Sequence, residues 1–293
     1  MSKTFVLTID VEIDAGKKWR TSNPASYEGV YTGIPRLQAV CKAFEVKPVY
    51  LISPAVMVDP RSVEVLNSIG AQHCELGAHL HGEYIGPNPK FPGPDFGGCD
   101  PAEMQCQYEP ALEFAKLQTL TDRFIELFGQ RPLSFRAGRF GARGWTIHCL
   151  QQLGYTHDTS VTPFRNWRGI ADFSRPGGLS PYYASTEDIC QPGNSSVIEV
   201  PVSITPDLEW LRPTPRFSDF EGCRRVIDWY EQHTQPTVLC CMFHNVELVA
   251  GMSPYCETQA DCQAMLGRIE AIFELVASRG YRFKTLSQVT VEA

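Results

Sequence analysis

Two histidines, His79 and His81, are one residue apart at the end of an apolar run in the segment ELGAHLHGE. In a β-strand, residues i and i+2 point to the same face, so the two imidazoles would lie side by side. Asp10 and Glu12 have the same spacing in the segment FVLTIDVEID. Imidazole nitrogens and carboxylate oxygens suit a zinc-like divalent cation. The pattern therefore predicts a metal site built from two separate strands.

The elements that position these residues alternate along the chain between strand-like and helix-like segments. The expected strands cover residues 4–10, 47–53, 74–81, 133–137, 155–160, 197–202 and 237–244. The segments between them place apolar residues at spacings of three and four, as amphipathic helices do. Thr258 with Asp261, and Ser218 with Glu221, have the spacing of capping boxes. The alternation predicts one α/β domain over residues 1–293, a (β/α)7-type distorted TIM-like barrel.

In such a barrel the carboxyl ends of the strands meet at one mouth, where polar residues gather. The candidates at this mouth are Asp10, Glu12, His79, His81, Arg136, Asp158 and His244. Charged groups in otherwise apolar runs are costly to bury unless they pair with one another or with a metal. Two long segments, 84–100 and 162–196, follow strands and are rich in Pro, Gly and aromatic residues. We expect them to wall a substrate groove.

Composition and charge exclude several classes of partner. The formal net charge of the 293-residue chain is -7, without a Lys/Arg cluster, which argues against nucleic acid and anionic membranes. No run approaches roughly 18 apolar residues, so no membrane span is expected. The N-terminal residues lead directly into a strand without a secretion signal, which predicts a cytoplasmic protein. The eleven cysteines form no CxxC pair and are expected to be reduced core thiols.

Five motifs in order give the chain a resemblance to a known family. LTIDVE resembles the first motif of the polysaccharide deacetylase superfamily, usually written TFDDG, and GAHLH resembles the second, a histidine motif. FRAGRFG resembles the third, RxPYG, while THDTSV and MFHNVEL resemble the fourth and fifth. The resemblance to these NodB-homology, carbohydrate esterase family 4-like enzymes extends over nearly the whole length. It implies a metal-dependent deacetylase acting on amide bonds, with an amino sugar or glycan precursor as substrate.

The resemblance also implies a role for each matching residue. Asp10 matches the general base, and Arg136 would hold its carboxylate. His244 matches the general acid, with Asp158 tuning or orienting it. His79 matches a metal ligand, and the metal would be a divalent cation such as zinc.

The chain departs from the family pattern at three positions. Val11 stands where the family has its second aspartate, so Glu12 is the nearest replacement as a ligand. Glu83 stands where the family has its second histidine, four residues after the first. His81 is the preferred ligand because it shares a face with His79, and Glu83 is the reserve candidate. Gly138 replaces the proline of the third motif.

Three other functions remain open from the sequence. A barrel glycosidase would use Asp10 and Glu12 as its two carboxylates, but it would leave the histidines without a role. A barrel that has lost its metal would bind sugars or partners without catalysis. A hydrolase of small N-acyl compounds would use the same residues as a sugar deacetylase. The sequence decides neither the substrate, a small molecule or an oligosaccharide, nor the oligomeric state.

Overall fold

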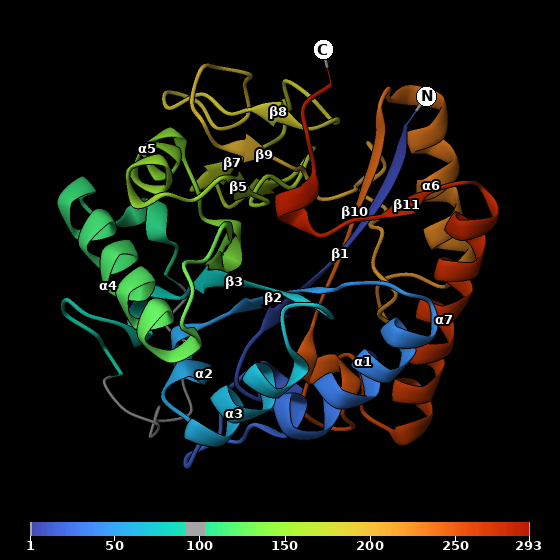
Figure 1. Ribbon diagram of the computed structural model, residues 1–293, viewed down its shortest axis with the longest axis horizontal. Coiled ribbons are helices and arrows are strands. Elements are labelled where there is room, and N and C mark those ends of the chain that lie inside the picture. The colour runs from blue at the N-terminus through green and yellow to red at the C-terminus, as the bar shows by residue number, and fades with distance from the viewer. Residues whose placement is uncertain (1, 92–102, 293) are drawn as a thin grey trace.

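A curled sheet of mainly parallel strands forms the centre of the molecule, shown as a computed structural model in Figure 1. The structure describes residues 2–91 and 103–292. The strand order is β10-β1-β2-β3-β4-β5-β9-β8, and β11 also pairs with β1. The strands are β1 (Lys3–Val11), β2 (Val49–Ile52), β3 (Glu75–Leu80), β4 (Ser134–Ala137), β5 (His157–Asp158), β8 (Tyr182–Tyr183), β9 (Ile198–Glu199), β10 (Thr237–His244) and β11 (Arg282–Phe283). Seven of them, β1 to β5 with β9 and β10, lie in the segments that the sequence predicts. β10 has the predicted bounds, β1 is one residue longer at each end, and the other five are shorter than predicted.

Helices cover the outside of this sheet (Figure 1). They are α1 (Ile34–Ala43), α2 (Pro54–Met57), α3 (Pro60–Ile69), α4 (Pro110–Phe128), α5 (Gly144–Leu153), α6 (Phe220–His233) and α7 (Gln259–Ser278). In the view of Figure 1, α4 and α5 lie on one side of the strands, and α6 and α7 lie on the other. The apolar stripes of the long helices face the sheet, as with the buried Leu117, Leu120 and Phe124 of α4. The predicted α/β class and distorted seven-stranded barrel are confirmed.

An extended segment after β9 connects the two sides of the sheet. The amide of Val202 donates to the carbonyl of Val161, which follows β5, at 3.0 Å. The amide of Ser203 donates to the carbonyl of Cys240 on β10, also at 3.0 Å. These bonds curl the open sheet toward a barrel. In its interior, the side chains of Thr8 on β1, Arg136 on β4 and Cys240 on β10 contact one another.

Strands β1 and β10 are buried on both faces, which explains their nearly continuous apolar sequences. They pair in parallel with Asp10 beside His244. On the other side of the sheet, β3 pairs with β4 and places His79 beside Arg136. Parallel pairing brings the carboxyl ends of these strands to the same edge. The polar residues that end each strand therefore meet there.

One of the two predicted helix capping boxes is present in the structure, and the other is displaced. Thr258 is the N-cap of α7, and its hydroxyl accepts from the amide of Asp261 at 3.1 Å, as predicted. The N-cap of α6 is instead Asp219, whose carboxylate accepts from the amide of Gly222 at 2.7 Å. The predicted Ser218 box is therefore wrong by one residue, because the aspartate adjacent to the helix already satisfies one of its free amides.

The segment 162–196 has more structure than expected. It contains β8 and a small antiparallel hairpin of β6 (Asn166–Trp167) and β7 (Ala171–Asp172). Of the other long segment, 84–100, residues 92–100 lie outside the described residues. All ten cysteines within the described ranges are free thiols, nine of them buried, as expected from the sequence. Within residues 2–91 and 103–292, no helix combines the length and the apolar character needed to cross a membrane.

Candidate active site

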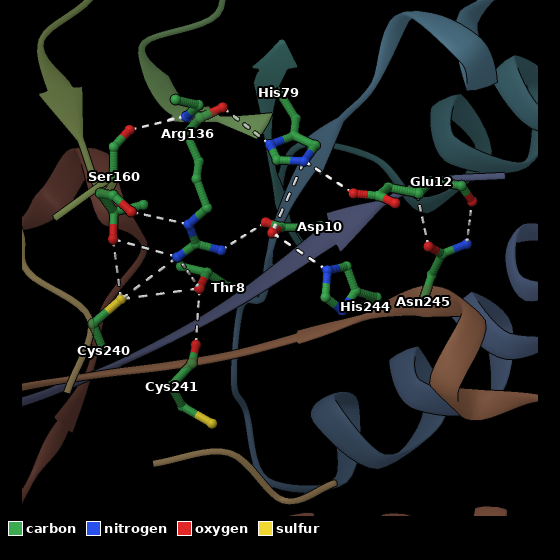
Figure 2. A network of polar contacts seen from close by, with 12 residues as sticks. Thr8, Asp10, Glu12, His79, Arg136, Ser160, Cys240, Cys241, His244 and Asn245 are labelled. Carbon is green, nitrogen blue, oxygen red and sulfur yellow. Dashed lines mark hydrogen bonds and ion pairs between the residues drawn. The ribbon is translucent and has the colours of Figure 1, made fainter. Parts of the chain in front are cut away.

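Three predicted metal ligands come together at the carboxyl edge of the sheet. The Nε2 atom of His79 lies 3.1 Å from Oε1 of Glu12, and the Nε2 atom of His81 lies 3.0 Å from the same oxygen. One ligand atom from each of the three residues falls within 4.8 Å of the others. Figure 2 shows Glu12, just beyond the end of β1, facing His79 on β3. The structure thus brings together the two histidines and the carboxylate that the strand spacing selects.

The orientation of His79 is fixed from behind. Its Nδ1 atom lies 3.0 Å from the carbonyl oxygen of Arg136, which only accepts hydrogen bonds (Figure 2). Nδ1 therefore carries the proton, and the lone pair of Nε2 points toward Glu12 in the neutral ring. A carbonyl partner of this kind is the usual support of a metal-ligating histidine.

His81 is supported by a buried ion pair. Its Nδ1 atom lies 3.4 Å from Oε1 of Glu83, and that oxygen also accepts from Nη1 of Arg139 at 2.8 Å. Burial opposes a charge on His81, but Glu12 and Glu83 outweigh it and raise the pKa of His81 to about 10. Burial likewise opposes ionisation of Glu83, while His81 and Arg139 lower its pKa to about 2. The two carboxylates therefore stabilise positive charge at His81.

Glu83, the reserve ligand, lies on the far side of His81 from Glu12. Its Oε1 atom faces Nδ1 of His81, whereas Glu12 faces Nε2. It belongs to the short 3-10 turn Gly82–Tyr84, which turns the chain away from the face that His79 and His81 share. Glu83 therefore orients a candidate ligand and is not part of the three-residue cluster.

Asp10 lies at the centre of the site and is held by Arg136. Nη1 of Arg136 donates to Oδ1 of Asp10 at 2.6 Å, and both side chains are almost fully buried. The other carboxylate oxygen, Oδ2, lies 3.9 Å from Nε2 of His79 and 3.9 Å from Nε2 of His244 (Figure 2). Burial would raise the pKa of Asp10, but Arg136, His79 and His244 together hold it below its ordinary value. Asp10 is therefore an ionised carboxylate at neutral pH.

Arg136 crosses the interior of the barrel to reach Asp10. Its Nε atom donates to the carbonyl of Thr159 at 2.9 Å, and Nη2 donates to the hydroxyl of Thr8 at 2.7 Å. These bonds satisfy a fully buried guanidinium on three sides and fix its direction. The predicted pairing of Arg136 with Asp10 is thus present in the structure.

His244 faces Asp10 from β10 with one ring nitrogen and a second carboxylate with the other. Its Nδ1 atom lies 2.7 Å from Oε1 of Glu247, three residues later in the turn Asn245–Leu248. Trp19 packs edge-on against the imidazole, with ring centroids 5.0 Å apart. The imidazole is therefore held at Nδ1, while Nε2 faces the centre of the site.

Asp158 differs from its expected place. Its Oδ1 atom accepts from the hydroxyl of Ser160 at 2.7 Å, and the carboxyl group is hydrogen-bonded to that of Glu199 on the neighbouring strand β9. Among the described residues, the polar partners of His244 are Asp10, Arg212 and Glu247, and Asp158 is not one of them. The reason is topological, because β5 and β10 are not neighbours in the sheet. The carboxylate beside His244 comes from the turn that follows its own strand.

Asn245 positions the backbone of Glu12. Its Oδ1 atom accepts from the amide of Glu12 at 2.8 Å, and Nδ2 donates to the carbonyl of Glu12 at 3.0 Å (Figure 2). Because Glu12 lies just beyond the end of β1, it has no neighbouring strand residue to fix it. The side chain of Asn245 supplies that ladder pairing.

A pocket opens beside the three-residue cluster. It contains about 340 Å³ of empty space, including the open solvent at its mouth, and its lining includes Glu12, Trp19, His81, Tyr84 and Arg139. The described part of the segment 84–100 contributes Tyr84, as expected for a wall. The segment 162–196 does not line this pocket; its Trp167 instead stacks on Phe140, with ring centroids 5.5 Å apart. The loop that contains Trp19 takes the place expected for that segment.

Four residues that support the site were not predicted from the sequence: Arg139, Arg212, Asn245 and Glu247. Two of them had a signal, since Asn245 and Glu247 follow His244 directly in HNVE, where one turn returns a side chain to the histidine. A third signal exists for Arg139, which follows Arg136 by three residues in the motif FRAGRFG and lies in the turn directly after β4. Arg212 had none, because only the path of the segment after β9 brings it to the site.

Comparisons with known proteins agree on the fold. No protein-family model and no curated protein sequence matches the chain. Among solved structures, a protein from Mycobacterium smegmatis assigned as a polysaccharide deacetylase is similar with a TM-score of 0.58, 17% identity, and coverage of 99% of this chain and 96% of that one. The Puue allantoinase is similar with a TM-score of 0.58, 13% identity, and coverage of 97% and 88%.

A Streptococcus mutans CE4 esterase is similar with a TM-score of 0.51, 11% identity, and coverage of 97% of this chain and 86% of that one. Each likeness extends over almost the entire chain at low sequence identity, so what is shared is the arrangement of strands and helices. That arrangement is the one that the five ordered motifs imply. The protein has the fold of the polysaccharide deacetylases.

Proposed function

We propose that the protein is a metal-dependent hydrolase of carbon-nitrogen bonds in linear amides, and that it removes the acetyl group from an N-acetyl amino sugar or a glycan precursor. The observation that carries the proposal is the convergence of two kinds of group on one edge of the sheet. Glu12, His79 and His81 form a donor cluster. Asp10 and His244 lie next to it as a pair of acid–base groups 3.9 Å apart.

The donor cluster fits a divalent cation such as zinc. Two Nε2 atoms and one carboxylate oxygen are the donors of a common type of catalytic zinc site. The protonated Nδ1 of His79 leaves its Nε2 lone pair available to a cation. The two carboxylates beside His81 favour positive charge at that place. When bound, the cation would polarise the acyl oxygen of the substrate and lower the pKa of a coordinated water to roughly 7.

Asp10 supplies the base in this proposal. Its low pKa keeps it ionised, and Oδ2 is the oxygen that is free of the Arg136 hydrogen bond. Oδ2 faces the donor cluster through His79, so it would accept the proton of the attacking water. Arg136 keeps the carboxylate from turning, because it holds Oδ1 from inside the barrel.

His244 supplies the acid. Nε2 points into the site opposite the donor cluster and would deliver a proton to the leaving nitrogen once the tetrahedral intermediate forms. General acid and base steps of this kind each contribute on the order of 100-fold to 10,000-fold in rate. Trp19, packed on the imidazole, shields this proton transfer from solvent.

The charges around Asp10 and Glu12 argue against the glycosidase alternative. A glycosidase needs one of its two carboxyl groups to keep a proton near neutral pH, as its general acid. Burial would favour that proton at both Asp10 and Glu12. Arg136 outweighs burial at Asp10, and His81 with His79 outweighs it at Glu12, so both pKa values are lowered. Neither carboxyl group is suited to donate a proton.

Two substitutions test the assignment of the acid and the base. We expect Asp10→Asn and His244→Ala each to reduce acetate release from N,N′-diacetylchitobiose by about 100-fold or more, because each removes one acid–base step. The matched control is His233→Ala, which removes an exposed histidine on α6 and should leave the rate unchanged. Near-normal turnover by either site variant would contradict the role assigned to that residue.

Metal analysis separates the proposal from a barrel that binds without catalysis. Purified protein should contain about one equivalent of a divalent metal, and a chelator should remove both the metal and the activity. Substitution of His79 or His81 by alanine should abolish metal binding. A protein that binds no metal and releases no acetate would favour the non-catalytic alternative. If the wild-type protein acts only on small N-acyl compounds, the proposed substrate is wrong but the proposed mechanism still holds.

A further inference from the structure

We propose that Glu247, held by Arg212 and Thr214, is the positioning residue that presents His244 as the general acid. This inference rests on the proposed function and goes beyond it, because it names the group that makes the acid effective. The resemblance to the family gives that place to Asp158, which the structure pairs with Glu199 instead.

The carboxylate of Glu247 contacts the ring of His244 directly. Nδ1 of His244 lies 2.7 Å from Oε1 of Glu247, which is a short charge-assisted distance. Nη2 of Arg212 also lies 3.2 Å from Nδ1, but the contact with Glu247 is the shorter one, and a carboxylate only accepts. Nδ1 therefore donates to Glu247, and the ring is fixed with Nε2 toward Asp10. The amide of His244 also reaches Oε1 of Glu247, at 3.2 Å. Backbone and ring are thereby tied to one oxygen.

The carboxylate itself is held on its other side. Nη2 of Arg212 donates to Oε1 of Glu247, and the hydroxyl of Thr214 donates to Oε2. Nε of Arg212 donates to the same hydroxyl at 3.0 Å, which closes a ring of hydrogen bonds. Glu247 is fully buried, so its carboxylate has no access to solvent as an alternative partner. Burial opposes its ionisation, but Arg212 and His244 lower its pKa to about 2, so it stays a carboxylate.

Aromatic rings enclose this network. The guanidinium carbon of Arg212 lies 3.9 Å from the ring centroid of Phe217 and 5.2 Å from that of Tyr255. Tyr255 in turn packs on Trp19, which covers His244. The charges that act on His244 are thus Asp10 from β1, Glu12 just beyond the end of β1, Glu247 from its own turn, and Arg212 from the segment after β9. Because Arg212 neutralises Glu247, the carboxylate acts mainly by holding the ring.

A change of leaving group separates this role from a purely structural one. A sugar amine needs a proton to leave, whereas 4-nitrophenolate leaves without one, so only the first reaction depends on a well-placed acid. We expect Glu247→Gln to slow acetate release from N,N′-diacetylchitobiose by about 10-fold to 100-fold. Hydrolysis of 4-nitrophenyl acetate by the same variant should fall by less than about 3-fold, since the base and the metal donors are untouched.

Two further variants keep the test decisive. Thr214→Val leaves the pair of Arg212 and Glu247 intact and removes the two hydrogen bonds of the hydroxyl, one donated to Glu247 and one accepted from Arg212. It therefore tests the same ratio if Glu247→Gln does not fold. It should shift the ratio of amide to ester rates in the same direction by a smaller factor. Asp158→Asn should leave the ratio unchanged. A folded Glu247→Gln that loses both activities equally, or a ratio that follows Asp158 instead, would overturn the inference.

A measurement without substrate distinguishes failure of the inference from failure of the proposed function. When the His244 ring carries a single proton, ¹⁵N NMR should show that proton on Nδ1 in the wild-type protein and a shift toward Nε2 in Glu247→Gln. A wild-type ring with its proton on Nε2 would contradict the role of Glu247. A wild-type protein with the Nδ1 proton but no acetate release from the sugar would contradict only the proposed activity.

Discussion

At the level of single residues, the departures from the family pattern explain one another. Gly138 stands where the third motif has proline, and a Cβ atom placed there would lie 2.5 Å from the carbonyl oxygen of Leu80 and 3.0 Å from a ring carbon of His81. The position can therefore hold no side chain unless the backbone of Leu80, at the end of β3, moves, and His81 follows Leu80 directly. The loss of the proline makes room for the imidazole of His81, which also lies two residues, rather than four, after His79.

This close approach gives a prediction for Gly138. We expect Gly138→Ala to push the His81 ring away from Glu12 and to weaken zinc binding by about 10-fold to 100-fold, the range seen when the support of a ligand is changed. Isothermal titration with zinc measures the affinity directly. The matched control is Gly267→Ala on α7, where an added Cβ meets no atom within 4 Å. Equal zinc affinities for the two variants would mean that His81 does not bind the metal.

Among the helices and strands, a buried lysine organises the turn that follows β3. Lys116 on α4 donates from Nζ to the carbonyl oxygens of Gly82, Ile85 and Pro87, each at 2.7 Å. This turn carries Glu83, which supports His81, and Tyr84, which lines the pocket. Burial lowers the pKa of Lys116, and the negative charges of Glu103 and Glu83 oppose this shift only in part. One helix side chain thus shapes a wall of the site.

Replacement of this lysine tests its role. We expect Lys116→Met to lower the free energy of unfolding by about 1–3 kcal/mol, because the buried carbonyl groups lose their donor. Hydrogen exchange should speed up in residues 82–88 before it does elsewhere, and urea unfolding gives the total effect. Arg123→Met on the same helix is the control, since its pair with Glu126 is exposed and contributes little. A destabilisation spread evenly over the chain would argue against a local role.

For the molecule as a whole, one pair of acids ties the stability of the barrel to pH. Burial and the neighbouring Asp158 raise the pKa of Glu199 well above its ordinary value, and burial also raises the pKa of Asp158. The folded protein therefore keeps a proton on this pair that the unfolded chain releases above about pH 4.5. The contribution to stability is complete below that pH and declines as the pH rises toward the folded pKa.

A substitution of Glu199 should remove this dependence. Glutamine keeps a donor for Asp158 and an acceptor for the amide of Val161, which now bonds to Glu199 at 3.0 Å. We expect Glu199→Gln to be as stable as the wild type near pH 4.5 and more stable at pH 8, with a smaller slope between them. The slope lost is at most about 1.4 kcal/mol per pH unit. Chemical unfolding across this pH range measures it, with the exposed Glu274→Gln as the control.

The order and spacing of residues were enough to predict the strands, the barrel and most of the central site. Period-2 spacing at the end of β1 and β3 selected Asp10, Glu12, His79 and His81, because strand geometry alone decides which side chains share a face. Parallel strands then bring those ends together whatever the loops do. The order of the motifs also predicted Arg136 and His244 as site residues. They lie on β4 and β10, the neighbours of β3 and β1 in the sheet.

The support of these residues, in contrast, follows only from the folded chain. The carboxylate beside His244 is Glu247 and not Asp158, because sheet order separates β5 from β10 and a local turn returns Glu247 to its histidine. Arg212 comes from a segment whose path depends on packing against distant elements, and Arg139 reaches Glu83 only because β3 and β4 are neighbours in the sheet. Each arginine pairs with a buried carboxylate from another segment of the chain. Residue spacing along one strand does not predict such a contact, because only the tertiary fold brings the two segments together.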